Sequence, residues 1–401
     1  MILTHEIINI ISENLKIKPL DFGFAGEVYS KFNFQNTEQI KVIGKYIFAY
    51  QNTCANRNAL YYSDSFLDAV TIIEQAYNDY CYIYQSQLDY EFKRYVLFSI
   101  IEYFINAVSK LIHLCFENKT VRFDFYAALK NELENYMDIL VKLMFSETLT
   151  EIPLTRNDLY SDIKKSFMNM NTPTLRGHVE YDHKLLLVYT YILYGDIINE
   201  NELLLCPLLG AVQIPPFIKS MEKYFNYRFF GNRVLTYDYV KYSTYDISEF
   251  ISLDEQSAEL KNIHNKYSRV ILLDESLGTG TTLLEIKKNL HNYFEDIKIG
   301  AVEFYWDKKI VWNYDRQWFS IDDIDFITPV SYRHYMMLTN QVACLKLNVF
   351  TPLPYVPFMI YDDYNFEYYM SKQKKSEEKN KSMDAFFYKS RIIKEVFYMT
   401  P

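Results

Sequence analysis

Two kinds of hydrophobic pattern divide this chain near residue 200. Before it, long stretches carry apolar residues at three- and four-residue spacing, which is the period of a helix with one buried face. These stretches are 65–82, 90–117, 121–147, 156–170 and 180–198. After it, short apolar runs alternate with helical patterns, as in a parallel sheet with helical crossovers. The pattern predicts an α/β fold in which a mostly α-helical domain, 1–198, precedes a parallel-sheet domain, 199–345.

The second half contains the elements that such a sheet requires, in alternating order. Predicted strands lie at 203–206, 233–240, 270–273, 298–305 and 325–330, and predicted helices at 217–224, 283–290 and 332–338. Residues 346–401 form a C-terminal extension, in which the mixed-charge run 371–382 predicts a surface loop. Residues 384–399 resume an amphipathic pattern, so we expect a terminal helix there.

One stretch of the helical half, 95–116, is long and apolar enough to suggest a membrane span. Polar side chains interrupt it at helical spacing, at Glu102, Asn106, Lys110 and His113. Charges at such depth in a bilayer are costly. We therefore expect a buried amphipathic helix and not a membrane-spanning one.

The residues that suggest chemistry lie at 270–283, which read VILLDESLGTGTTL. An apolar run ends at Asp274 and Glu275, and a glycine-threonine loop leads from there into a predicted helix. Glycines let the backbone bend closely around an anion, while threonine hydroxyls and the amides at a helix N-terminus donate hydrogen bonds to it. Carboxylates at a strand end can accept hydrogen bonds from sugar hydroxyls or hold a hydrated magnesium ion. The stretch therefore predicts a site for a ribose phosphate.

Two other phosphate-binding motifs fit this stretch less well. A Walker A loop needs a lysine where Thr281 stands, and a dinucleotide fingerprint needs a third glycine where Leu283 stands. The remaining alternative is a plain strand–turn–helix unit whose glycines only close a turn.

The same stretch resembles the signature of type I phosphoribosyltransferases, in which an apolar strand, two acidic residues and a T-G-x-T loop bind phosphoribosyl pyrophosphate. The resemblance implies a type I phosphoribosyltransferase-like domain in which Asp274 and Glu275 are the catalytic pair and hold the ribose hydroxyls. It implies that the 5-phosphate is bound by Ser276, Leu277, Gly278, Thr279, Gly280, Thr281 and Thr282. Magnesium is the implied cofactor, carried by the substrate near the acidic pair and not by a separate protein site.

The resemblance also implies an earlier loop that surrounds the pyrophosphate. It assigns this role to Leu208, Leu209, Gly210 and Ala211, and to Lys241 at the end of the next predicted strand. The polar run 242–254 then corresponds to a flexible loop that closes over the site. Only 10 glycines occur in 401 residues, and three of them, at 210, 278 and 280, fall in the two proposed loops. The alternatives are a strand with a proline-bounded turn for the first loop and a solvated side chain for the lysine.

A candidate acceptor site follows the predicted strand 298–305. Trp306 and Asp307 lie at its far end, where an open parallel sheet places its ligands. The indole of Trp306 can stack on a nucleobase. The alternative is a hydrophobic cover for the edge of the sheet.

The composition narrows the set of partners. An excess of 51 acidic over 42 basic side chains gives a net charge of −9, which disfavours broad binding to duplex nucleic acid. The five cysteines show no CxxC spacing and no N-terminal signal segment is visible, so we expect a reduced, cytoplasmic setting without a membrane. His178 and His183 have no cysteine nearby and do not predict a metal site.

The leading expectation is an enzyme that binds phosphoribosyl pyrophosphate with Mg²⁺ and transfers the phosphoribosyl group to a nucleobase or another nitrogenous acceptor. Its helical domain suggests a specialised effector, for example in bacterial antiviral defence or conflict. One alternative is a regulator that senses phosphoribosyl pyrophosphate or a nucleotide without catalysis, since Gly278 stands where several purine-salvage members carry an aspartate. Another is a scaffold whose helical half binds a protein. The sequence leaves an oligomer open.

Overall fold

A computed structural model describes the following part of the chain. The described residues are 39, 42, 46, 66–88, 90–117, 122–149, 152, 154, 158–167, 187–188, 190–191, 194–195, 198–208, 210–237, 239–244, 247–252, 266–277, 281–304 and 326–327. The predictions for 332–338 and for the C-terminal extension lie outside them.

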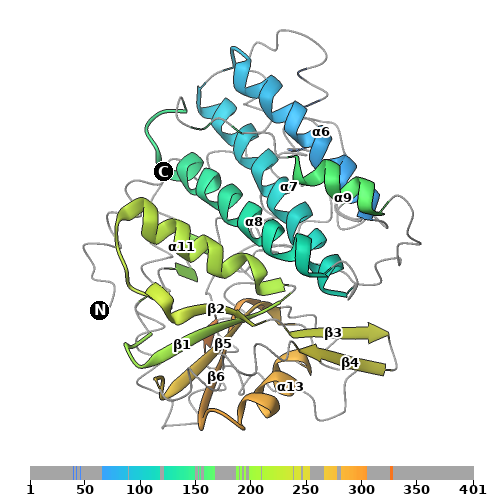
Figure 1. Cartoon of the computed structure of the whole chain (residues 1–401). Helices are drawn as coiled ribbons and strands as arrows, with labels where there is room; N and C mark the ends of the chain where they lie inside the picture. Colours follow the sequence, from blue (N-terminus) through green and yellow to red (C-terminus); the bar gives the residue numbers. More distant parts are fainter. Residues whose placement is uncertain are drawn as a thin grey trace, which may run out of the picture.

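The first half of the described chain is helical, as its periodicity predicts. The helices are α6 (Phe66–Gln85), α7 (Tyr90–Glu117), α8 (Arg122–Phe145) and α9 (Leu159–Phe167). We call them the helical half. Helix α7 packs against both α6 and α8, and Figure 1 shows it between them. Its residues 96–112 are buried apart from the half-buried Ala107, which is the pattern of a helix covered on all sides. Within the described residues, no helix combines the length and apolar character needed to cross a bilayer.

The second half forms a parallel sheet whose strand order is β2-β1-β5-β6-β7. The strands are β1 (Glu202–Pro207), β2 (Val234–Tyr237), β5 (Arg269–Leu277), β6 (Asp296–Phe304) and β7 (Phe326–Ile327). All four neighbouring pairs run parallel. The predicted α/β class with a parallel sheet is therefore confirmed.

Alternating side chains of the strands face two different layers. One set packs with helix α11 (Ile214–Phe225) and with the helical half in a single buried cluster; its strand members include Leu204, Cys206, Ile271 and Leu273. The other set packs with helix α13 (Thr281–Leu290); its strand members include Leu203, Leu205, Val270 and Leu272. The sheet thus lies between α11 and α13, and the helical half adds a further layer outside α11 (Figure 1).

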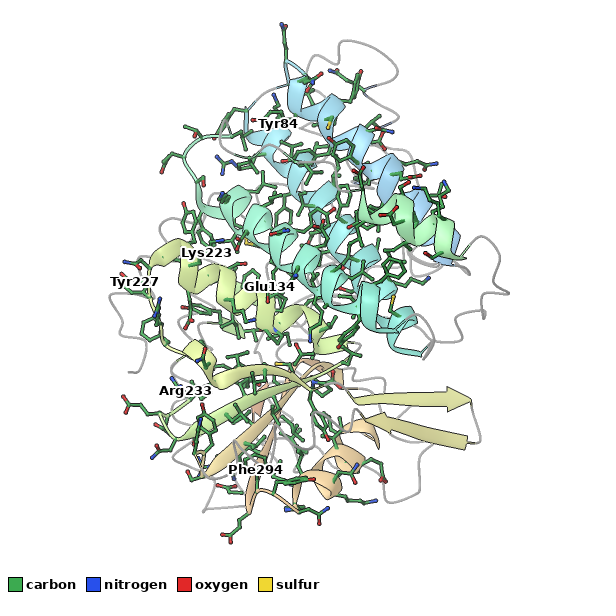
Figure 2. All side chains as sticks on the ribbon, in the orientation of Figure 1. Tyr84, Glu134, Lys223, Tyr227, Arg233 and Phe294 are labelled. Atoms are coloured by element: carbon green, nitrogen blue, oxygen red, sulfur yellow. The ribbon has the colours of Figure 1, made fainter. Side chains whose placement is uncertain are left out.

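Polar contacts also join α11 to α8 at the border between the two halves. Lys219 pairs with Glu134 at 2.8 Å, and the Ser220 hydroxyl donates to the Asp138 carboxylate at 2.7 Å. Lys223 forms an ion pair with the same aspartate. Figure 2 shows Glu134 and Lys223 on the facing sides of α8 and α11. The two halves are therefore joined both by a shared core and by surface contacts.

The predicted start of the helix after the first loop is corrected. Helix α11 begins at Ile214, three residues before the predicted start, because Pro215 and Pro216 occupy its first turn. Proline fits there, since the first amides of a helix have no intrahelical acceptor and proline carries the required φ angle. The short 3₁₀ helix η1 (Gly210–Gln213) fills the space between β1 and α11.

The predicted strand 233–240 is divided between two sheets. Strand β2 ends at Tyr237, and β3 (Tyr239–Thr244) pairs antiparallel with β4 (Ile247–Ser252) in a separate hairpin. Residues 242–244 and 247–252 thus form strands where the sequence analysis expected an irregular polar loop. The hairpin carries β-branched and aromatic residues at most of its positions, and these favour extended pairing.

Candidate functional site

The direction of strand addition reverses between β1 and β5. From β1 the chain adds β2 on one side and then crosses to β5 on the other side of β1. The helix after β1, α11, covers one face of the sheet, and the helix after β5, α13, covers the other. In open α/β sheets, ligands bind at the carboxyl ends of the strands where the order reverses in this way. We call this end of the sheet the carboxyl edge.

The loops that follow β1 and β5 are the two to which the sequence assigns a ligand role. Leu205 of β1 is paired with Leu272 of β5, so that two residues further on Pro207 lies level with Asp274. The loop after β1 therefore begins beside Asp274, and β5 continues three residues further before its own loop begins. This juxtaposition comes from the sheet topology, because more than 60 residues of sequence separate the two loops.

Asp274 lies inside strand β5, level with Pro207 of β1, and its side chain is half-buried. Burial raises the pKa of the Cys206 thiol well above its ordinary value, and the negative charge of Asp274 raises it further. The thiol therefore stays protonated at neutral pH and is a poor nucleophile.

Strand β5 is longer than predicted and includes much of the proposed phosphate loop. Its backbone continues through Glu275, Ser276 and Leu277, and the last two pair with Glu303 and Phe304 of β6. The prediction that the acidic pair follows the strand is corrected, because ladder hydrogen bonds carry the strand beyond its apolar run. Gly278, Thr279 and Gly280 lie outside the described residues.

Helix α13 starts earlier than predicted, at Thr281, so Thr281 and Thr282 form its first turn and not part of a loop. Only three residues separate the end of β5 from the start of α13. The amides of the first helical turn therefore lie close to the carboxyl edge of the sheet. Such amides have no acceptor within the helix and, together with the helix dipole, favour an anion.

The loop after β1, residues 208–213, is a packed turn and not an open one. The Leu208 amide donates to the Tyr237 carbonyl at 2.7 Å, which ties the loop to the end of β2. The side chains of Leu208 and Ala211 are buried in the cluster shared with the helical half. Gly210 opens η1, which contacts both β1 and β5. Leu209 lies outside the described residues.

The structure does not place Lys241 at the end of a main-sheet strand. It lies within β3, where its backbone is level with Phe250 of β4. The prediction for its position is therefore wrong, because the chain enters a second sheet directly after β2. Strand β6 ends at Phe304, level with Leu277 at the carboxyl edge. Trp306 and Asp307, the predicted acceptor residues, lie outside the described residues.

A polar contact that no local sequence pattern indicates reaches this loop from the helical half. The side-chain amide of Gln213 donates to Asn106 Oδ1 at 3.1 Å and to Ser109 Oγ at 3.0 Å. All three side chains are buried, with 2–3% of their surface exposed. The signal in the sequence was Asn106 itself, a polar residue in an otherwise apolar helix. Its contact 107 positions away gave no local signal.

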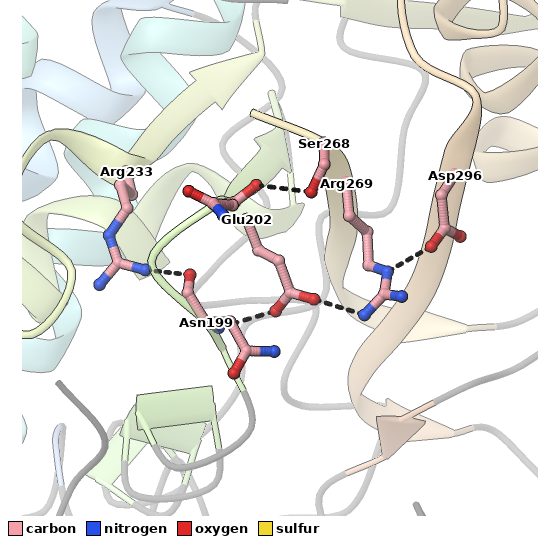
Figure 3. A network of polar contacts seen from close by, with 7 residues as sticks. Asn199, Glu202, Arg233, Ser268, Arg269 and Asp296 are labelled. Atoms are coloured by element: carbon pink, nitrogen blue, oxygen red, sulfur yellow. Dashed lines mark hydrogen bonds and ion pairs between the residues drawn. The ribbon is translucent and has the colours of Figure 1, made fainter. Parts of the chain in front are cut away.

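The opposite end of the sheet, the amino edge, carries a different polar network. Arg269 at the start of β5 forms ion pairs with Glu202 at the start of β1 and with Asp296 at the start of β6 (Figure 3). Glu202 also accepts a hydrogen bond from the Asn199 amide at 2.7 Å. Partial burial lowers the pKa of Arg269, but the two carboxylates outweigh this effect and raise it. These groups satisfy one another and join three strands.

Carboxylate oxygens at the carboxyl edge are suited to a hard cation such as Mg²⁺. Among the described residues, no three His, Cys, Asp or Glu side chains form a group that could hold a metal ion. A magnesium ion that arrives with substrate phosphates needs only one or two protein carboxylates. Asp274 fits such a role.

No known family, curated protein or solved structure matches this chain.

Proposed function

We propose that this protein binds phosphoribosyl pyrophosphate with Mg²⁺ at the carboxyl edge of its sheet and transfers the phosphoribosyl group to a nucleobase or another nitrogenous acceptor. The observation that carries the proposal is the parallel pairing of β1 with β5 at the reversal of strand order. It brings together the two loops whose residues resemble the phosphoribosyltransferase pattern. Asp274 lies between them, at the place where such sheets bind ligands.

Each part of the site has a separate role in the proposed reaction. Asp274 and Glu275 accept hydrogen bonds from the ribose hydroxyls and stabilise the positive charge that develops at C1 of the sugar. The glycine-threonine loop and the first amides of α13 bind the 5-phosphate. The loop after β1 binds the pyrophosphate that leaves from C1. Mg²⁺ bound with the pyrophosphate supplies positive charge to the leaving group.

A second candidate is a sensor that binds the same ligand without turnover. The observation that favours it is the packing of the loop after β1, where Leu208 and Ala211 are buried. These side chains offer no hydrogen bond or charge to a pyrophosphate, so binding of the pyrophosphate by this loop depends on its backbone amides. Weak stabilisation of the pyrophosphate is compatible with binding of the ligand, but it slows cleavage of the bond between C1 and the pyrophosphate.

Calorimetric titration with phosphoribosyl pyrophosphate and Mg²⁺ tests binding. We expect the variant Asp274→Ala/Glu275→Ala to bind the ligand at least about 100-fold more weakly. Each substitution removes a carboxylate that accepts hydrogen bonds from the ligand in the proposed site. Glu295→Ala is the matched control, because this exposed carboxylate precedes β6 at the amino edge. The proposal fails if the wild-type protein does not bind, or if the double variant binds as well as the control.

Release of pyrophosphate separates the enzyme from the sensor. The wild-type protein is incubated with phosphoribosyl pyrophosphate, Mg²⁺ and a panel of nucleobases and amines. Release that depends on one acceptor and is absent in the double variant supports the transferase. Binding of phosphoribosyl pyrophosphate without release of pyrophosphate, whichever acceptor is present, supports the sensor.

A further inference from the structure

The helical half reaches the proposed pyrophosphate loop through one buried side chain, Gln213. This residue ends η1 and directly precedes α11. Its amide nitrogen bonds Asn106 and Ser109, which lie on α7 of the helical half. The contact therefore joins the loop after β1 to a helix more than 100 positions earlier in the chain.

The orientation of this amide is defined by the atoms around it. The Ser109 hydroxyl donates its hydrogen to the Ile105 carbonyl at 2.7 Å, so its oxygen is left to accept from Gln213. The Asn106 oxygen accepts the other N–H of the same amide. Both donors of the Gln213 NH₂ group are thus used by α7. A flipped amide would place its carbonyl against two oxygens, and only one of these has a hydrogen, already committed elsewhere.

Helix capping does not account for the glutamine. Gln213 is the N-cap residue of α11, yet its side chain makes no capping hydrogen bond. Pro215 and Pro216 in the first turn lack amide hydrogens, which reduces the need for a cap. The side chain points instead to α7, where it supplies hydrogen bonds to two buried oxygens. A buried polar contact specifies one arrangement of its partners more strictly than apolar packing does.

The loop is consequently held at both of its ends. At the start, the Leu208 amide bonds the Tyr237 carbonyl of β2. At the end, Gln213 bonds α7. The residues between them include Gly210 and Ala211, which the proposed function assigns to the pyrophosphate.

We propose that Gln213 is a positioning residue, through which α7 holds the loop after β1 in the geometry that binds the pyrophosphate. The helical half is then part of the ligand site and not an appended module. This inference rests on the proposed function. It predicts a selective effect, because the 5-phosphate is assigned to the other loop, after β5, which Gln213 does not hold.

Gln213→Met tests the proposal, since methionine keeps the length of the side chain and removes both donors. Calorimetry compares two ligands, phosphoribosyl pyrophosphate with Mg²⁺ and ribose 5-phosphate. We expect about tenfold weaker binding of the first and less than about twofold change for the second. Ser220→Ala is the control, because it breaks a contact between α11 and α8 away from the loop. It should leave both affinities unchanged.

Three results would overturn the proposal. An equal loss of affinity for both ligands would mean general destabilisation. Unchanged affinity for both would mean that the contact does not position the loop. Absence of binding by the wild-type protein would refute the proposed function itself, and this inference with it. Should Gln213→Met fail to fold, Ser109→Ala decides the question, since it removes one of the two acceptors and should give the same selectivity at a smaller size.

Discussion

The two edges of the parallel sheet use acidic residues in opposite ways. At the amino edge, Glu202 and Asp296 begin their strands and both pair with Arg269, which begins the strand between them. Toward the carboxyl edge of the same strand, Asp274 lies level with Pro207, where the loop after β1 starts. Charges at the amino edge therefore join strands, while the carboxylate toward the carboxyl edge lies where we propose that the ligand binds. The comparison predicts that changes at the first edge alter stability and changes at the second alter binding.

The largest effect on stability is expected from Arg269→Met. The change leaves Glu202, whose side chain is only 5% exposed, without its cation. Breaking a buried ion pair from one side costs about 3–5 kcal/mol, and we expect about 2 kcal/mol here because Arg269 and Asp296 are partly exposed. Urea unfolding followed by fluorescence measures the loss.

A control and a binding measurement complete this test. Lys288→Met removes an exposed ion pair with Glu285 on α13 and should cost less than about 0.5 kcal/mol. Affinity for phosphoribosyl pyrophosphate should be unchanged in both variants. A selective loss of affinity in Arg269→Met would contradict the division between the two edges.

The next effect concerns Gly300, in the middle of β6, where the sheet meets the helical residues before β1. A Cβ atom at this position would lie 2.1 Å from the Tyr194 hydroxyl and 3.0 Å from its ring carbon Cζ. Because Tyr194 is buried, its ring has to shift when Gly300 becomes alanine. We expect a loss of about 1.5 kcal/mol, the cost of overpacking less the gain from replacing a glycine.

A second substitution shows whether this close approach is the cause. Tyr194→Phe removes the atom nearest to the new methyl group. The double variant should therefore lose less than the sum of the two single variants, as measured by the free energy of unfolding in urea. Strict additivity would show that the methyl group is accommodated in another way.

The periodic parts of this fold could be predicted from the sequence, while contacts between distant residues could not. Helices α6, α7 and α8 follow their apolar spacing closely. The class of the sheet follows from the alternation of strands and helices. The hairpin β3–β4 was missed because its polar positions suggested a loop, although pairing between strands does not require apolar residues. The predicted start of α11 was three residues late, since Pro215 and Pro216 fit the first turn of a helix.

The candidate site divides in the same way. Residue type and spacing selected Asp274 and the glycine-threonine loop, and the family resemblance selected the loop after β1; their roles stay predictions. The role of Gln213 depends on how α7 packs against the loop after β1, and no local pattern contains that information. The position of Lys241 was predicted wrongly because the chain leaves the main sheet after Tyr237, and one continuous extended pattern hides the change of sheet.

The smallest effect concerns another acidic residue, Glu222. Its contacts lie where the chain enters β2 at the amino edge. Its carboxylate, in a residue only 8% exposed, accepts hydrogen bonds from the Phe230 amide at 2.6 Å and from the Gly231 amide. Burial raises the pKa of this carboxyl, and the amides lower it by less, so the net pKa lies above its usual value. The folded state therefore holds the proton to higher pH than the unfolded state does.

This direction of the pKa shift fixes the sign of a pH dependence. The stability that comes from the bound proton is fully present below the unfolded pKa and is lost as pH rises through the folded pKa. Glu222→Gln keeps an oxygen for the Phe230 amide and carries no charge at any pH. Between about pH 4 and pH 7, the wild-type protein should lose stability relative to this variant, and the two should differ by less than about 1 kcal/mol at neutral pH. Urea unfolding at several pH values measures the difference. If the stability of the wild-type protein rises relative to the variant with increasing pH, the backbone amides outweigh burial. Glu222 would then stabilise the fold in its charged form, as Glu202 does.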